Sequence, residues 1–337
     1  MALKKKILLI ATVIAVFATV ALVAGGQKEH VYEVGFGHGF MPDSVHHTAA
    51  LAFKEEVESK SNGRVKISIF HSGQLGSARE MFEGLQMGSL DITLVPTARI
   101  SGFAPQLQIF DLPFLFPSAE VRNTILDGPI GQELLDTLKN QQVVGIGFYD
   151  DGYKQITGNK PLIAPADFKG LKFRTMESAI IMEQYRALGA DPVPIDYAEV
   201  YSALQMGVVD GHENPIVLIS DMKFHEVQQY IMISNHAFLG GVLLYASSWF
   251  SKLPEDLQQI FVDAGQSMVK RQRQGVAQIE ADLLKDIAAT GTHIIELTDA
   301  QKEALRLATL PVHEIYRKEF GGAILDKIYA EVEKLSK

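Results

Sequence analysis

The feature that most constrains the fold is the alternation of strand-like and helix-like stretches over residues 31–95. Val65, Ile67 and Ile69 alternate with polar side chains, which is the pattern of a half-buried strand. Apolar residues at helical spacing follow the first strand and again the second. We therefore expect strands at 31–36, 64–70 and 90–95, with helices at 45–57 and 77–88. This order is typical of an α/β fold with a doubly wound parallel sheet.

The second part of the chain contains further elements of the same two kinds. Short strands are expected at 143–148, 171–175 and 230–235. Asp196-x-x-Glu199 predicts a capping box that opens a helix, and Gly207 is its expected stop. The chain therefore has enough elements for two α/β units.

Later signals concern how these units are joined. A helical pattern runs from Pro254 to about Thr290, which is longer than most globular helices. Gly240-Gly241 marks an expected return crossing between the units, and Thr298-x-x-Gln301 opens a further helix pair. Since the chain has no long linker, the units must be joined by crossing strands.

Residues 1–26 have the three parts of a secretory signal peptide. Lys4, Lys5 and Lys6 form a basic start, residues 7–24 carry no charge, and small residues follow. We expect cleavage between about Gly25 and Lys28 and a mature protein in a periplasm. The alternative is an uncleaved anchor, because an apolar run of this length can just span a bilayer.

Composition excludes several classes of function. The chain has no cysteine, so disulfides, thiolate metal sites and thiol nucleophiles are excluded. Its formal net charge is −9, and removal of the three leader lysines makes the mature form more acidic still. That charge argues against binding to nucleic acid. An acidic protein that binds an anion must gather positive charge locally.

Several sequence blocks occur in an order and spacing that resemble one known family. They are ISIFHSGQLGSAREMFEGLQMGSLDIT, FDLPFLF, GLKFRT, VDGHENP and FHEVQQYIMISNH. Together they resemble the solute-binding proteins of tripartite ATP-independent periplasmic (TRAP) transporters. The resemblance covers nearly all of the chain after about residue 30. It implies a receptor rather than an enzyme, with no cofactor.

The resemblance also implies an architecture and partners. Two α/β lobes close on a ligand, with a long helix lying across both. We expect lobe I to comprise 27–151 plus 240–279, and lobe II 152–239 plus 280–337. The expected partners are a small organic acid and the integral membrane subunits of a TRAP transporter. We expect a monomer.

The expected ligand contacts are Arg174, Asn214, Lys154, Tyr197, Arg99 and His38. Arg174 matches the residue that grips the ligand carboxylate in the family. Lys154 stands where the family often has an arginine, and it keeps the charge without the bidentate fork. Asn214 and Tyr197 match an amide and an aromatic residue of the family's pocket. His38 is added as a neutral donor near the mouth of the cleft.

Each of these residues has a plainer interpretation that the sequence leaves open. Arg174 can be a strand-end arginine paired with a local carboxylate, Arg99 a solvated loop residue, and Tyr197 a half-buried core residue. Asp210 and Glu213 are expected to brace a turn rather than to contact an anion.

Other functional classes are less well supported. Gly35-x-Gly37-x-Gly39 follows a strand, but no acidic residue ends a second strand where a dinucleotide site needs one. No histidine pair has the spacing of a zinc motif, so no metal site is expected. Ser220-x-x-Lys223 lacks the companion motifs of a penicillin-recognising enzyme. An exported hydrolase or metal-binding protein remains the alternative from another class.

The ligand is expected to carry one carboxylate and several hydroxyls, as in a sugar acid such as a hexuronate. Lys154 suits hydroxyl recognition better than bidentate pairing. Pro96 stands where some sialic-acid-binding members carry a carboxylate, so sialic acid is not expected. A C4-dicarboxylate is the alternative, with Arg99 as a second clamp.

Overall fold

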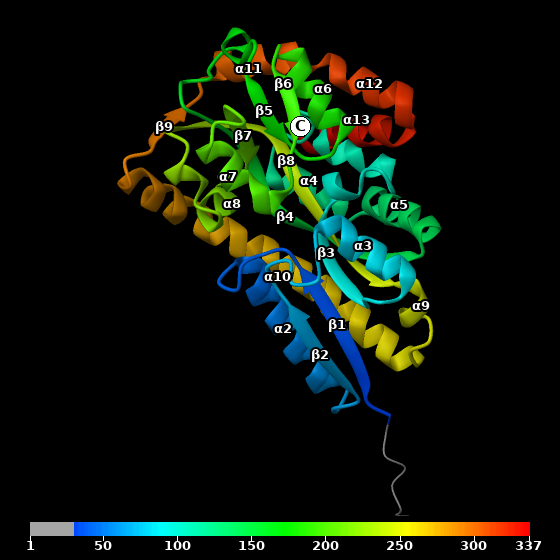
Figure 1. Cartoon of the computed structure of the whole chain (residues 1–337). Helices are drawn as coiled ribbons and strands as arrows, with labels where there is room; N and C mark the ends of the chain where they lie inside the picture. Colours follow the sequence, from blue (N-terminus) through cyan, green and yellow to red (C-terminus); the bar gives the residue numbers. More distant parts are fainter. Residues whose placement is uncertain (1–29) are drawn as a thin grey trace, which may run out of the picture.

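Residues 30–337 are described by a computed structural model, so the predicted signal peptide lies outside the described residues. They form one mixed sheet in the order β2-β1-β3-β8-β4-β7-β5-β6, with β9 paired to β8 (Figure 1). The strands are β1 Tyr32–His38, β2 Val65–Phe70, β3 Ile92–Pro96, β4 Val143–Gly158, β5 Lys172–Thr175, β6 Asp191–Pro194, β7 Gly211–Asn214, β8 Tyr230–Ala246 and β9 His293–Glu296.

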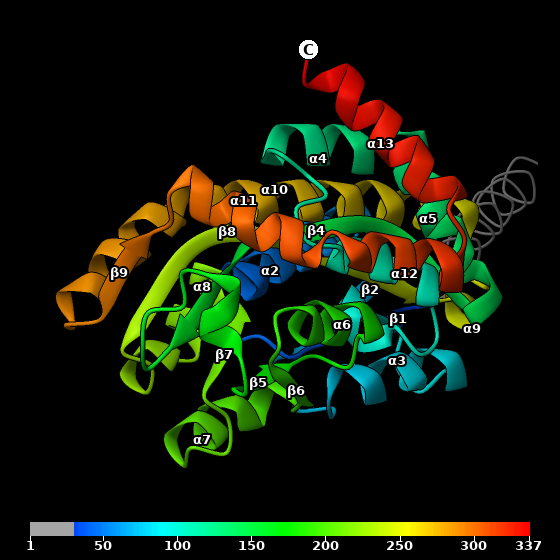
Figure 2. The ribbon, with the colours of Figure 1, turned by 90° about the horizontal axis from the view of Figure 1, so that it is seen from above.

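Helices cover both sides of this sheet, and Figure 2 shows α3 and α10 on opposite sides. The α-helices are α2 Val45–Lys60, α3 Ala78–Met87, α4 Ala119–Leu126, α5 Pro129–Thr137, α6 Ala179–Ala187, α7 Val200–Gln205, α8 Ile216–Asp221, α9 Ser247–Phe250, α10 Glu255–Ala289, α11 Asp299–Thr309, α12 Pro311–Phe320 and α13 Ala323–Leu335. The α/β class expected from the sequence is confirmed.

The two ends of the sheet are parallel and its middle is antiparallel. β1 runs parallel to β2 and β3, and β5 runs parallel to β6 and β7. Between them, β8 is antiparallel to both β3 and β4, and β4 is antiparallel to β7. As a result, the carboxyl ends of the two parallel groups point toward one another.

The two middle strands are much longer than the sequence pattern predicts. Strands expected at 143–148 and 230–235 extend to 16 residues in β4 and 17 in β8. Their pairing shifts register between Asp150 and Tyr153, where Gly152 has φ of +100°. A bulge of this kind breaks the alternation of apolar and polar residues, so the bulged segment reads as a turn. The expected crossing at Gly240-Gly241 lies within β8.

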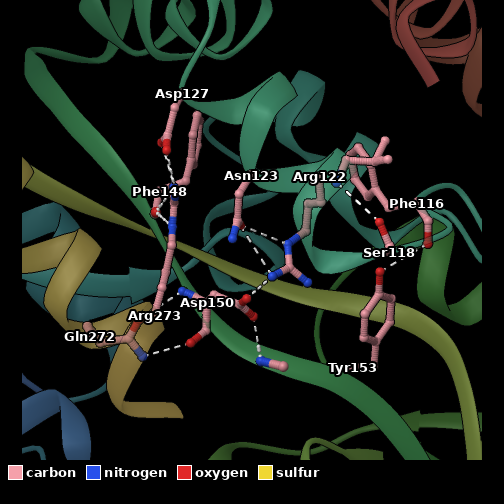
Figure 3. Close-up of polar contacts among 12 residues, drawn as sticks. Phe116, Ser118, Arg122, Asn123, Asp127, Phe148, Asp150, Tyr153, Gln272 and Arg273 are labelled. Carbon is pink, nitrogen blue, oxygen red and sulfur yellow. Dashed lines mark hydrogen bonds and ion pairs between the residues drawn. The ribbon is translucent and has the colours of Figure 1, made fainter. Parts of the chain in front are cut away.

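Helix α10 is attached directly to the irregular part of β4 (Figure 3). The Gln272 side chain donates to the Asp150 carbonyl oxygen at 2.7 Å and accepts from its backbone N–H at 3.0 Å. The neighbouring Arg273 Nε donates to the Phe148 carbonyl oxygen at 2.9 Å. Bonds that the bulged strand cannot make within the sheet are thus supplied by the helix.

A buried arginine joins α4 to the same part of β4. Arg122 is 1% exposed, forms an ion pair with Asp150, and lies over the Phe238 ring at 4.2 Å from its centroid. Burial lowers the pKa of Arg122 to about 10, which leaves it charged at neutral pH. Since a buried charge is costly unless it is paired, this contact fixes α4 against the strand.

Most helix boundaries follow their sequence signals. The helix expected at 77–88 is α3, opened by a capping box between Ser77 and Glu80, and the helix expected to reach Thr290 is α10. The box predicted from Asp196 to Glu199 is wrong in one respect. Asp196 does cap, but its side chain accepts from Ala198 N, and a 3-10 turn at Tyr197–Glu199 precedes α7. In this tighter 3-10 turn, the backbone N–H that reaches the Asp196 side chain belongs to the second residue after Asp196, not to the third.

The apolar FDLPFLF segment is buried beside β4 and β8 rather than exposed. Phe110, Leu112, Leu115 and Phe116 are each at most 5% exposed and belong to one core cluster with Phe148 and Phe238. Over residues 30–337, no helix combines the length and apolar character needed to cross a bilayer.

Candidate functional site

A cavity of about 320 Å³ lies where the carboxyl ends of the two parallel strand groups face one another. Phe40 follows β1, Ser72 follows β2, Arg99 follows β3 and Met176 follows β5. Ligands of open α/β sheets bind in such crevices, because the loops there can vary without disturbing the sheet. The lining residues are Gly39, Phe40, Ser72, Gly73, Gly76, Ser77, Ala78, Leu94, Pro96, Arg99, Arg174, Met176, Asp196, Tyr197, Ala198, Asn214, Leu218 and Leu239.

Arg174, at the end of β5, is the most unusual group in this lining. It is 1% exposed, and its Nε and Nη2 atoms donate to the Ile195 carbonyl oxygen at 3.0 and 2.8 Å. No carboxylate among residues 30–337 forms an ion pair with it. Burial, and after it the charge of Arg99, lowers the pKa of Arg174 to about 9, so it is cationic at neutral pH.

Arg99 approaches the same carbonyl oxygen from the opposite group of strands. Its Nη2 donates to the Ile195 oxygen at 3.3 Å, and its Nη1 lies 3.5 Å from the Asp196 carboxylate. Arg99 is 7% exposed, and burial lowers its pKa, with Asp196 opposing that shift. Asp196 therefore compensates the charge of Arg99, whereas the charge of Arg174 has no carboxylate partner among residues 30–337.

Asn214 and Tyr197 also line the cavity. Asn214 ends β7, and its Nδ2 lies 3.0 Å from Nδ1 of His212. Burial lowers the pKa of His212 to about 3, so its neutral ring can accept this bond. Tyr197 is half-buried and packs edge-on against Phe224. The structure thus brings together four of the six residues named from the sequence: Arg174, Arg99, Asn214 and Tyr197.

Lys154 is not brought to the cavity lining. Its Nζ lies 2.6 Å from Oε1 of Glu213, and both side chains are 1% exposed. We expected Glu213 to brace a turn, but it lies inside β7. Asp210 does brace the turn, because its side chain accepts a hydrogen bond from Lys172 N at 2.8 Å. The antiparallel, bulged course of β4 directs Lys154 to this internal partner.

His38 is also absent from the lining. Its Nδ1 accepts from Phe40 N at 3.2 Å, so the proton is placed on Nε2, 3.1 Å from Nδ1 of His47. Burial, and then the neighbouring His47, lowers the pKa of His38 to about 3, which agrees with the neutral form expected. The ring is fully buried, and both of its nitrogens have partners within the protein.

Most residues that line the cavity were not predicted from the sequence. Phe40, Met176, Leu218 and Leu239 supply apolar surface and look like ordinary core residues in the sequence. The loop from Ser72 to Ser77 offered a signal, because it follows a predicted strand and contains two glycines with positive φ, at 73 and 76. Loops at strand carboxyl ends are where binding residues are expected.

Within the described part of the chain, no cluster of histidine and acidic side chains is arranged to hold a metal ion. Two guanidinium groups, one carboxylate, one amide and several hydroxyl groups lie among the apolar residues that line the cavity. Such a set can bind an organic anion.

Comparisons with known proteins identify the family of this chain and structures that share its fold. Residues 36–319 match the family model described as bacterial extracellular solute-binding protein, family 7. A solute-binding protein of Verminephrobacter eiseniae is 35% identical over 82% of each chain.

Two solved structures share the fold closely. The sugar acid binding protein of Advenella mimigardefordensis in complex with galactonate has a TM-score of 0.87 and 31% identity, covering 90% of this chain and 99% of its own. A TRAP periplasmic solute-binding protein of Sulfurospirillum deleyianum with bound succinate has a TM-score of 0.85 and 32% identity, covering 89% and 99%.

Proposed function

Because the chain belongs to family 7 of the bacterial extracellular solute-binding proteins, we propose that it is a TRAP receptor for a sugar acid with one carboxylate. It binds this acid in the cavity and releases it to the membrane subunits of its transporter without chemical change. Family members act in the periplasm, which suits the signal peptide predicted over 1–26.

The observation that carries the proposal is the buried Arg174 without a carboxylate partner. A buried guanidinium charge costs several kcal/mol unless an anion meets it. Its fork is suited to two parallel hydrogen bonds with a carboxylate, and such charge-assisted bonds are among the strongest in proteins. A ligand carboxylate would supply the missing partner.

The charge around the cavity favours a single carboxylate. Arg174 and Arg99 are cationic and Asp196 is anionic, which leaves one uncompensated positive charge in the lining. Asn214 and the hydroxyl groups of Ser72, Ser77 and Tyr197 provide neutral donors and acceptors for hydroxyls. The apolar wall suits the C–H faces of a sugar-derived chain.

A C4-dicarboxylate is the second candidate. It is favoured by the closeness of Arg99 to Arg174, since two guanidinium groups on one carbonyl oxygen could each hold a carboxylate. Asp196 opposes this, because it already neutralises Arg99 and its own charge would repel a second anion.

We further propose that the two ends of the sheet act as lobes with the boundaries predicted from the sequence. Closure would bring the strand ends together around the ligand, and the ligand would favour the closed form by binding it more tightly. Arg174 and Asn214 would then act from one lobe and Arg99 from the other. The closed monomer is what the membrane subunits would recognise.

Thermal-shift screening over organic acids, followed by calorimetry, tests the proposal. We expect micromolar or tighter binding of a sugar acid such as galactonate or galacturonate, and weaker binding of succinate and malate. Binding of a C4-dicarboxylate with no sugar acid would support the second candidate. Absence of binding by any organic acid would overturn both.

A further inference from the structure

A buried polar cluster lies behind the cavity wall, between β4, β7 and β8. Lys154 and Glu213 form its centre, with 2.6 Å between Nζ and Oε1 and both side chains 1% exposed. Oε2 of Glu213 accepts from Tyr185 Oη at 2.7 Å and lies 2.7 Å from Nε2 of His236. Every oxygen of this carboxylate is thus occupied within the protein.

Glu213 is held in its charged form. Burial alone would raise the pKa of its carboxyl, but Lys154 and His236 together hold that pKa well below its usual value. The Lys154–Glu213 pair is therefore a closed unit that presents no net charge to its surroundings.

The strand geometry places this unit directly behind the ligand-facing residues. Arg174 pairs in register with His212, and Asn214 is two residues further along β7, so all three share one face of the sheet. Glu213 lies between them in sequence and faces the other side, away from the cavity. A change of charge there acts on the cavity through one layer of backbone.

We infer that Glu213 is a specificity-determining residue of the proposed receptor. By neutralising Lys154, it leaves a single uncompensated guanidinium at the cavity and so disfavours ligands with a second carboxylate. This inference rests on the proposed function, and it assigns Lys154 a role behind the site instead of a contact with ligand.

One other acid faces Lys154 and must be controlled. Asp111 is 1% exposed, its Oδ2 has no hydrogen-bond partner within residues 30–337, and burial raises its pKa to about 6. A pKa of about 6 leaves Asp111 largely ionised at neutral pH, so it could still compensate Lys154 if Glu213 lost its charge. The experiment therefore uses an Asp111→Asn background.

A matched pair of ligands isolates the second carboxylate. Galactonate has one carboxylate, and galactarate is the same chain with a carboxylate at both ends. In D111N, galactonate should bind more tightly than galactarate. Adding E213Q should shift the affinity ratio toward galactarate at least tenfold, and adding K154M to that double variant should restore the D111N ratio within threefold.

Two results would overturn the inference. One is an affinity ratio in D111N/E213Q that stays within threefold of D111N. The other is a loss of galactonate binding of tenfold or more in the folded K154M/D111N/E213Q protein, which would make Lys154 a direct contact. Because that triple variant removes the charges of all three residues, it tests for a direct Lys154 contact even if D111N/E213Q does not fold.

A ligand-free measurement separates this inference from the proposed function. In the otherwise wild-type protein, K154M should lower the urea midpoint strongly, because it leaves the Glu213 carboxylate buried without its cationic partner. The same substitution should lower the midpoint much less in E213Q. Equal effects in both backgrounds would show that the pair is not coupled and would overturn the inference. Failure of wild type to bind either sugar acid would instead count against the proposed function.

Discussion

At the scale of single residues, the Ile195 carbonyl oxygen is the point where the candidate site is organised. Arg174 and Arg99 both donate to it, from opposite groups of strands. One backbone oxygen carries only a partial charge, so it orients two guanidinium groups without neutralising them. The arrangement holds both groups at the cavity and leaves the charge of Arg174 without a carboxylate partner, whereas Arg99 has Asp196.

Replacing Arg174 should abolish ligand binding while the protein stays folded. We expect Arg174→Ala to weaken binding of the native acid ~100-fold or more, since a lost buried ion pair costs roughly 3–5 kcal/mol. Calorimetry measures this effect. Arg99→Gln is the matched control and should cost less, because Asp196 already compensates Arg99. An affinity within threefold of wild type for Arg174→Ala would refute the assignment.

Acid should destabilise the fold through its buried neutral histidines. His38 has a folded pKa of about 3 against 6.5 for a free histidine, so the unfolded chain takes up a proton first. Stability from this group is complete above pH 6.5 and falls as the pH drops toward 3, by about 2 kcal/mol at pH 5.

The variant His38→Gln should therefore lose less stability than wild type between pH 7.5 and pH 5. Urea denaturation at both pH values measures the difference. His30→Gln, which alters an exposed histidine, should retain the wild-type pH dependence. Equal pH dependence in His38→Gln and wild type would show that His38 is not the group responsible.

At the scale of elements, parallel strands explain why two predicted residues lie at the cavity, and a bulged strand explains why Lys154 does not. Arg174 and Asn214 meet because they lie near the carboxyl ends of neighbouring parallel strands, β5 and β7, where sequence position gives spatial position. Lys154 sits on an antiparallel strand with shifted register, so no sequence pattern could show which face it takes. The length of α10 was predictable from its uninterrupted helical spacing.

Gly241 shows how closely the two middle strands approach each other. It pairs with Tyr149, and a Cβ added at 241 would lie 1.9 Å from Cζ of that buried ring. We expect Gly241→Ala to lower the free energy of unfolding by about 3 kcal/mol through overpacking. Urea denaturation measures this change.

Two comparisons make the Gly241 prediction specific. Gly102→Ala adds the same methyl group where no atom lies within 4 Å, and it should change stability little. In a Tyr149→Ala background the cost of Gly241→Ala should nearly vanish, because the clash partner is gone. A similar cost in both backgrounds would contradict the clash.

At the scale of the whole molecule, α10 and the two long strands connect the ends of the sheet. α10 packs against α2 at one end, against β4 in the middle and against α8 at the other end. Neither end of the sheet is therefore complete without elements shared with the other. Any motion between them must bend β4 and β8 instead of rotating about a flexible loop.

The mature form should begin between about Gly25 and Lys28 and be recovered in the soluble periplasmic fraction. The reason is the small-residue exit from the uncharged run over 7–24, with no cysteine to acylate. Mass spectrometry of the purified protein measures the terminus. Recovery of the full-length chain with the membranes would show an anchor instead.

The position of β8 also constrains how the chain can fold as it is made. β8 ends at Ala246 and lies between β3 and β4, which precede it by many residues. A chain that emerges from a ribosome or a membrane pore with its N-terminus first must hold one edge of β3 unpaired until that late strand arrives. Open edges of this kind attract other chains. A chain that ends before β8 is therefore expected to expose the β3 edge and to aggregate more readily than the complete chain.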